Sequence, residues 1–200
     1  MRIDDDKKFM ARALELAANG MGHTRPNPMV GAVLVKDGEI IGEGWHEFYG
    51  GPHAEVNAFA DCRADPAGAT LYVTLEPCCH YGKTPPCADL IASKNLERVV
   101  VAMQDPNPKV AGRGMAMLRE AGAEVRCGVL AEEAARLNEV FLHWITTSEV
   151  EVKRELEQAL GRVRITTVHA SKGLEAPVVI LPDTVRVPSK DKVAKVLWDD

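Results

Sequence analysis

The stretch "ATLYVTLEPCCHYGKTPPCADLI", residues 69–91, holds three of the five cysteines of the chain between a strand-like and a helix-like segment. Residues 69–77 form a mostly apolar run that ends at a proline, which predicts a buried strand. Residues 87–95 predict a helix. Between them, cysteines alternate with prolines and a histidine, so this loop either depends on sulfur chemistry or carries part of a metal site.

Helices and strands alternate on both sides of this stretch. Upstream, the pattern predicts a helix at 4–19, a β-hairpin with its turn at 36–39, and a helix at 53–62. Downstream, it predicts a strand at 96–105, a helix at 112–122, a strand at 123–130 and a long amphipathic helix at 131–147. This order is typical of an α/β protein. We expect a three-layer α/β/α sandwich with a mixed central sheet.

Composition places the chain among globular proteins with an acidic balance. It has 200 residues, a hydrophobic share of 46% and a formal net charge of −5. That charge argues against a protein that tracks a phosphate backbone, because such affinity comes from Lys and Arg. No apolar run approaches the roughly 18–20 residues of a membrane span, and the amino terminus lacks the pattern of a secretory leader. We therefore predict a cytoplasmic protein without a membrane partner, whose clustered cysteines serve metal binding or catalysis rather than disulfides.

The character of the sequence changes after Thr147. Residues 148–200 comprise a highly charged helical segment, two strand-like segments and a polar end. We predict a catalytic domain over residues 1–147 and a short C-terminal appendage over residues 148–200. Two strands without a parent sheet are marginal, so the appendage is not expected to be an independent catalytic domain.

A further metal ligand lies upstream of the cysteines, in "PHAEV", residues 52–56. His53, Cys78 and Cys87 each lie beside a predicted helix start, and one imidazole with two thiolates suits Zn²⁺. Three protein ligands leave a position for water, which distinguishes a catalytic zinc site from a closed structural one. Glu55 lies two residues beyond the histidine, where a carboxylate is able to take a proton from that water and deliver it to a substrate.

Less specific interpretations stay open on the residues alone. The cysteines at 78 and 87 are alternatively buried thiols, or ligands of a structural zinc together with Cys79 and His80. H-x-E followed by P-C and a second cysteine is typical of zinc deaminases, although eight residues separate the two cysteines here instead of the shorter spacing in that pattern. Cys62 and Cys127 have no such companions and are expected to be packing residues.

Four segments, at 25–46, 50–58, 69–91 and 98–130, resemble the deaminase domain of the bifunctional riboflavin-biosynthesis deaminase/reductase. The resemblance runs from about residue 5 to residue 146. It implies a cytidine-deaminase-like fold, zinc at His53, Cys78 and Cys87, and Glu55 as proton shuttle. It also implies hydrolytic removal of the 2-amino group of 2,5-diamino-6-(5-phosphoribosylamino)pyrimidin-4(3H)-one, giving 5-amino-6-(5-phosphoribosylamino)uracil and ammonia.

The same resemblance suggests contacts with a phosphoribosyl-aminopyrimidine substrate. We expect Asn27 to hydrogen-bond the ribosyl group or the ring edge, and His46 and His80 to line the pocket. We expect the ribose and its phosphate to be held by Lys83, Asp105 and Asn107. A simpler explanation remains for several of them, because Asn-Pro and Asp-Pro-Asn-Pro form turns whatever they bind.

Residues 163–184, "VRITTVHASKGLEAPVVILPDT", resemble a stretch of UvrD-like, AddA-type DNA helicases. No phosphate-binding loop accompanies this segment, so we do not expect a motor. Residues 148–200 are also too short for a reductase domain, so we expect the reductase step to be absent and a separate reductase to perform it. A homo-oligomer is expected by analogy with the fold. Two other functions remain possible: a deaminase of cytosine or adenine in nucleosides or nucleic acid, and a DNA-associated module through the C-terminal segment.

Overall fold

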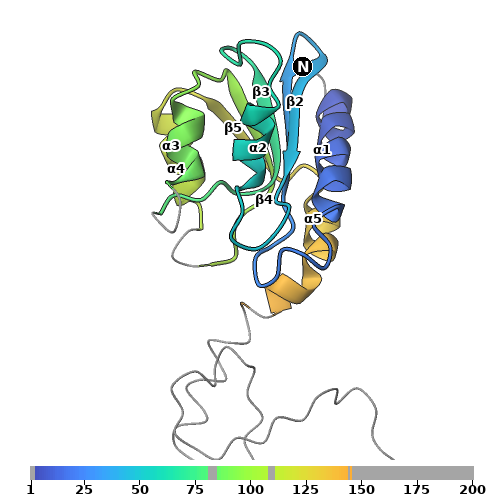
Figure 1. Cartoon of the computed structure of the whole chain (residues 1–200). Helices are drawn as coiled ribbons and strands as arrows, with labels where there is room; N and C mark the ends of the chain where they lie inside the picture. Colours follow the sequence, from blue (N-terminus) through green and yellow to red (C-terminus); the bar gives the residue numbers. More distant parts are fainter. Residues whose placement is uncertain (1–2, 81–84, 108–110, 144, 146–200) are drawn as a thin grey trace, which may run out of the picture. The chain divides into compact units, whose positions relative to one another are not determined.

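A computed structural model describes residues 3–80, 85–107, 111–143 and 145. Within these residues, strands form one sheet in the order β2-β1-β3-β4-β5, with helices on both of its faces (Figure 1). The strands are β1 (Gly31–Lys36), β2 (Glu39–Trp45), β3 (Thr70–Leu75), β4 (Arg98–Met103) and β5 (Glu124–Cys127). The helices are α1 (Ile3–Ala18), α2 (Ala54–Ala60), α3 (Cys87–Ala92), α4 (Arg113–Glu120) and α5 (Ala131–Leu137).

The sheet is mixed, as predicted. β1 is antiparallel to both β2 and β3, whereas β3, β4 and β5 run parallel to one another. The predicted hairpin turn contains Asp37 and Gly38 with φ of 52° and 82°, the backbone of a type I′ turn. Because β3 and β4 are parallel and Leu75 pairs with Met103, the loops that follow these two residues leave the sheet at the same edge.

Helices cover both faces of the sheet and complete the predicted three-layer sandwich. On one face α2, α3 and α4 pack against the strands, with Ala58, Ile91 and Leu118 among the buried side chains. On the other face α1 and α5 pack, with Met10 and Ala134 buried. Figure 1 shows α1 and α5 together on one side of the sheet, and α3 and α4 on the other side. The fold class expected from the sequence is confirmed.

Helix α2 lies close to the sheet because β2 contains two glycines. A Cβ atom on Gly44 would lie 2.3 Å from the backbone nitrogen of Ala58, and one on Gly42 would lie 2.5 Å from its carbonyl oxygen. A larger residue at either position would push α2 away from the sheet. This packing bears on the candidate site, because α2 begins directly after His53.

The last predicted helix is interrupted, which corrects the expectation of one continuous helix over 131–147. α5 ends at Leu137, and helical residues resume only at 139–143. At the interruption the buried Asn138 uses its side chain to bond the backbone of Met29, accepting from the N–H at 2.8 Å and donating to the C=O at 2.9 Å. An Asn side chain that bonds backbone in this way competes with regular helix geometry.

A buried ion cluster joins α1 to the strands. The carboxylate of Asp6, fully buried, accepts from Arg98 at 2.6 and 2.9 Å and from Arg126 at 2.9 Å. It also accepts from the hydroxyl of Tyr72 at 2.9 Å. The cluster connects the first helix to β3, β4 and β5, and none of its members was recognised from the sequence.

The predicted domain organisation concerns residues outside the described part of the chain. The domain boundary at residue 147 and the appendage over residues 148–200 both lie there. They stay predictions. Among the described residues, no helix has the length and apolar character needed to cross a membrane.

Candidate metal centre

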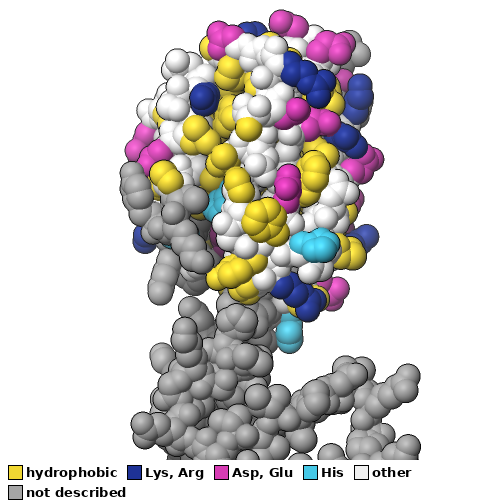
Figure 2. Space-filling view, in the orientation of Figure 1, with side chains coloured by type: hydrophobic (Ala, Val, Ile, Leu, Met, Phe, Trp, Pro, Cys, Tyr) yellow, Lys and Arg dark blue, Asp and Glu magenta, His cyan; other side chains and the backbone are white. Residues whose placement is uncertain are grey.

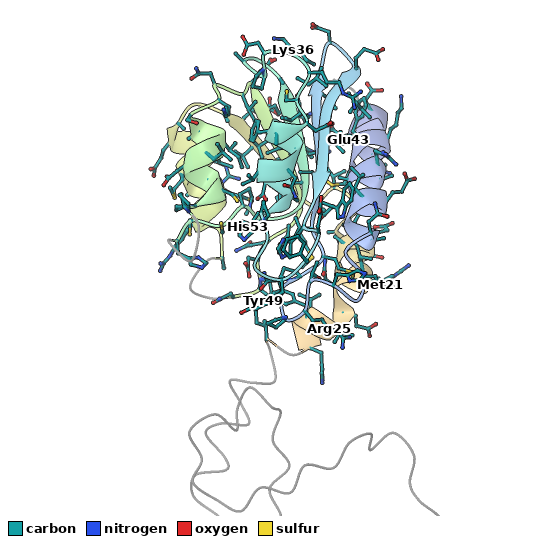
Figure 3. All side chains as sticks on the ribbon, in the orientation of Figure 1. Met21, Arg25, Lys36, Glu43, Tyr49 and His53 are labelled. Atoms are coloured by element: carbon teal, nitrogen blue, oxygen red, sulfur yellow. The ribbon has the colours of Figure 1, made fainter. Side chains whose placement is uncertain are left out.

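Three segments of the chain bring the predicted metal ligands together. His53 is the N-cap of α2, Cys87 is the first residue of α3, and Cys78 lies in the loop after β3. One ligand atom from each of them lies within 4.8 Å of the other two. Figure 3 shows His53 between Lys36, at the hairpin turn, and Tyr49 and Arg25, which lie farther from that turn.

The position of Cys78 differs from the sequence-based expectation of a helix start. The residue lies in a loop with no regular structure. A helix amide nevertheless reaches its sulfur, because the backbone N–H of Cys87 at the start of α3 donates to the Cys78 Sγ at 3.3 Å. The loop therefore places the sulfur beside a helix start without being part of the helix.

The spacing of the donor atoms fits a tetrahedral zinc ion. The His53 Nδ1 lies 3.3 Å from the Cys87 Sγ and 3.6 Å from the Cys78 Sγ. A tetrahedron with zinc–nitrogen and zinc–sulfur bonds of ordinary length separates N from S by about 3.6 Å. The three side chains are thus arranged as ligands with little movement required.

Hydrogen bonds between these residues make one sulfur acidic. The Cys87 thiol and the His53 ring both bond Cys78, and they lower the pKa of Cys78 to about 4. The same thiol–thiolate hydrogen bond raises the pKa of Cys87. Cys78 is therefore a thiolate near neutral pH, the form that binds a metal, and a metal that binds both sulfurs releases the proton of Cys87.

Glu55 lies in the first turn of α2, beside the ligands. Its side chain is only 3% exposed, and burial raises the pKa of its carboxyl group. It interacts with the Cys87 thiol, which places it next to the position of a metal. A buried carboxyl group with a raised pKa holds a proton more readily than an exposed one, which suits a group that accepts a proton and passes it on.

Two of the predicted substrate-binding residues bond each other beside the metal centre. The Nδ1 of the buried His46 is 2.9 Å from the carbonyl oxygen of Pro52, so Nδ1 carries the proton and donates. The bare Nε2 then accepts from the Nδ2 of Asn27 at 3.0 Å. Burial is the main cause of the lowered pKa of His46, so the neutral form of the ring is favoured. The ring of His46 also packs edge-on against His53, with 5.6 Å between centroids.

The other predicted substrate residues lie in the loops that follow β3 and β4. Asp105 and Asn107 are half-buried and form a turn, in which the Asn107 N–H donates to the Asp105 Oδ1 at 2.8 Å. Burial raises the pKa of Asp105, and the charges of Glu76, His80 and Cys78 also act on it. His80 is exposed. Lys83 lies outside the described residues.

The role of Glu76 was not predicted from the sequence. Its buried carboxylate accepts backbone N–H groups from the loop after β4 and from the start of α4. The sequence signal for this role is its position: Glu76 directly follows a buried strand and precedes Pro77 and Cys78.

The remaining cysteines lie outside the group of ligand atoms. Cys79 is half-buried, and Cys62 packs against the core of the α2 face as predicted. Cys127 is exposed, so the expectation that it is a packing residue was wrong. It lies at the end of β5, an edge strand whose side chains are not fully covered.

A match to a known family covers the three metal ligands and Glu55. Residues 3–103 match the cytidine and deoxycytidylate deaminase zinc-binding region. The chain belongs to this family. Zn²⁺ is accordingly the metal for the centre formed by His53, Cys78 and Cys87, and the donor set suits it.

Individual members of the family are similar to the chain over most of its length. The riboflavin biosynthesis protein RibD of Escherichia coli (strain K12) is 50% identical, over 98% of this chain and 57% of that protein. RibD of Actinobacillus pleuropneumoniae is 55% identical, over 71% of this chain and 38% of that protein. The chain thus spans between 38% and 57% of these relatives.

A solved structure agrees with the fold. It is a diaminohydroxyphosphoribosylaminopyrimidine deaminase/5-amino-6-(5-phosphoribosylamino)uracil reductase from Thermotoga maritima, 51% identical with a TM-score of 0.70. The match covers 73% of this deaminase chain and 42% of that chain. The expected cytidine-deaminase-like fold is confirmed. None of these matches supports the helicase-like resemblance of residues 163–184, which stays a prediction.

Proposed function

We propose that the chain is a zinc-dependent deaminase that acts on 2,5-diamino-6-(5-phosphoribosylamino)pyrimidin-4(3H)-one. Its products are 5-amino-6-(5-phosphoribosylamino)uracil and ammonia. The observation that carries the proposal is the convergence of His53, Cys78 and Cys87 beside the buried Glu55. The substrate is suggested by the half-identical RibD relatives and by the name of the Thermotoga maritima protein.

The residues of the site have separable tasks in this reaction. Zinc held by His53, Cys78 and Cys87 would supply a Lewis acid that makes a water molecule nucleophilic near neutral pH. Glu55 accepts a proton from that water and passes protons to a ring nitrogen and to the departing amine. One water is consumed and the 2-amino group leaves as ammonia. Because Glu55 is buried, its proton is exchanged with the substrate rather than with bulk water.

The Asn27–His46 pair supports a role in substrate binding. Asn27 donates from Nδ2 to His46, so its Oδ1 and its second N–H remain for a ligand. We propose that Asn27 contacts the ribosyl group or ring edge, that His46 fixes its orientation, and that His80 lines the pocket. We propose the ribose and phosphate contacts for Lys83, Asp105 and Asn107.

An assay of the purified full chain tests the proposal. Zinc is quantified per chain, and ammonia release is then compared between the aminopyrimidine and two controls, cytidine and deoxycytidylate. Preference for the aminopyrimidine, with one zinc per chain, is the expected result. Turnover of either cytosine substrate alone would replace the proposed substrate with the alternative one.

Nucleic acid is disfavoured as the substrate by charge. The net charge is −5, and on the face in Figure 2 the described Lys and Arg side chains lie among Asp and Glu. Affinity for a phosphate backbone requires a concentration of positive charge. DNA binding through residues 148–200 stays a separate prediction, and salt-dependent binding of DNA by the full chain would support it.

Further predictions concern partners and location. We propose that the deaminase is a homo-oligomer, which light scattering of the full chain would test. The exposed Phe48, five residues before His53 in the sequence, offers an apolar side chain to such contacts. A separate reductase for the next step and a cytoplasmic location both rest on the sequence alone.

A further inference from the structure

Glu76 connects the loop that carries Cys78 with the loop that carries Asp105 and Asn107. The residue is 3% exposed, and its carboxylate accepts hydrogen bonds from four backbone N–H groups. Cys78 follows it by two residues in the sequence.

One oxygen of the carboxylate joins both ends of the loop between β4 and α4. The Glu76 Oε2 accepts from the N–H of Asp105 at 3.2 Å and from the N–H of Gly112 at 2.9 Å. These donors lie at the two ends of the loop, of which residues 104–107 and 111–112 are described. Both ends of the loop are therefore held by hydrogen bonds to a single oxygen atom.

The other oxygen bonds the first turn of α4. The Glu76 Oε1 accepts from the N–H of Gly114 at 3.0 Å and of Met115 at 3.3 Å. The N-cap of this helix, Gly112, has no side chain of its own for these donors. A carboxylate at this end of a helix is also favoured by the helix dipole.

Backbone contacts hold the connection closely. The Glu76 N–H donates to the Met103 carbonyl oxygen at 3.0 Å, which extends the pairing of β3 with β4. A Cβ atom on Gly114 would lie 2.0 Å from the Pro77 carbonyl oxygen, so only glycine permits this approach of α4. Glu76, Pro77 and Cys78 therefore form one segment whose distance from α4 is narrowly defined.

We propose that Glu76 is a positioning residue that sets the place of Asp105 and Asn107 relative to the metal centre. It thereby controls affinity for the phosphoribosyl part of the substrate, without touching substrate or metal. The inference rests on the proposed function, because Asp105 and Asn107 are proposed there as ribose and phosphate contacts.

Glu76→Gln is the principal test, measured in the full-length zinc-loaded chain. Glutamine keeps the shape but has one acceptor oxygen, so its NH₂ group faces two N–H donors. Amide hydrogen exchange at Asp105, Gly112 and Gly114 should become faster, with zinc per chain unchanged. KM for the aminopyrimidine should rise about tenfold, while kcat changes much less.

A double-mutant cycle with Asn107→Ala separates positioning from a general structural effect. If Glu76 acts through the loop, Glu76→Gln should add little to the KM of Asn107→Ala. Asp6→Asn is the matched control, because it weakens a buried cluster elsewhere and should leave KM unchanged. If Glu76→Gln does not fold, Glu76→Asp replaces it. The aspartate keeps the negative charge, but its shorter side chain holds the carboxylate farther from the N–H donors.

The outcomes distinguish this inference from the proposed function. If the wild-type protein does not deaminate the aminopyrimidine, the proposed function is refuted. The inference about Glu76 is then refuted as well, and no variant needs to be compared. With an active wild type, fully additive effects on KM would overturn the positioning role alone. Loss of zinc in a folded Glu76→Gln variant would do the same, because Glu76 would then act on the metal centre.

Discussion

The side chain of His46 accepts a hydrogen bond from Asn27 at 3.0 Å because its other ring nitrogen donates to the carbonyl oxygen of Pro52. The carbonyl oxygen of Pro52, on the far side of the His46 ring, thus decides that Asn27 is the donor in its hydrogen bond with His46. This relationship fixes which end of the Asn27 amide faces the His46 ring.

Substitution of Asn27 tests that direction. Asn27→Asp places an acceptor against the bare His46 Nε2, so the variant should be less stable than Asn27→Ala at pH 8, by about 1–2 kcal/mol. Urea denaturation of both variants measures the difference. An aspartate variant as stable as wild type would mean that Nε2 carries a proton in that variant, on a doubly protonated ring or on the other tautomer, and would contradict the expected repulsion.

Removal of the proposed proton carrier should abolish turnover but not metal binding. Glu55→Gln keeps the size of the side chain and cannot exchange a proton, so kcat should fall by about 10²–10⁴-fold. Zinc per chain should stay at the wild-type value, since Glu55 is not among the three ligands. Glu39→Gln, an exposed substitution on β2, is the control. Near wild-type turnover by Glu55→Gln would remove Glu55 from the mechanism.

Loss of either sulfur ligand should cost the metal. Cys78→Ala and Cys87→Ala leave two protein ligands, which is fewer than zinc takes in catalytic sites. Metal analysis of the purified proteins should find zinc greatly reduced in both, while the exposed Cys127→Ala keeps it. Stoichiometric zinc in the Cys87→Ala protein would exclude that residue as a ligand.

The Asp6 cluster should account for much of the acid sensitivity of the fold. Burial opposes ionisation of Asp6, but the hydrogen bonds of Arg98 and Tyr72 and the charges of both arginines outweigh it, so its pKa is lowered. The folded protein then binds fewer protons than the unfolded chain. The contribution of Asp6 is present above about pH 4 and is lost as the pH falls through the folded-state pKa.

Asp6→Ala measures the size of that contribution. The substitution leaves Arg98 and Arg126 without their shared partner, so the free energy of unfolding at pH 7 should fall by about 3 kcal/mol or more. Arg12→Ala removes an exposed ion pair with Glu43 and should cost less than about 1 kcal/mol. Equal effects of the two substitutions in urea denaturation would contradict a special role for the cluster.

Local chemistry of the chain determined much of the fold and the types of ligand. Asp37 and Gly38 predict the hairpin because they tolerate positive φ, and the apolar runs of β3 and β4 predict buried strands. One histidine and two cysteines, His53, Cys78 and Cys87, indicated zinc because few other metals suit imidazole with two thiolates. These features depend on neighbouring residues, and so they can be read along the sequence.

Only the tertiary structure decided how distant residues meet. Asp6 and Arg98 are 92 positions apart, and Met29 and Asn138 are 109 apart, so no local pattern links either pair. The interruption of the last helix at Asn138 and the bonding of α4 to Glu76 have the same origin. A buried polar side chain takes whichever partner the packing brings to it, because leaving it unpaired is costly, and that partner is set by the whole fold.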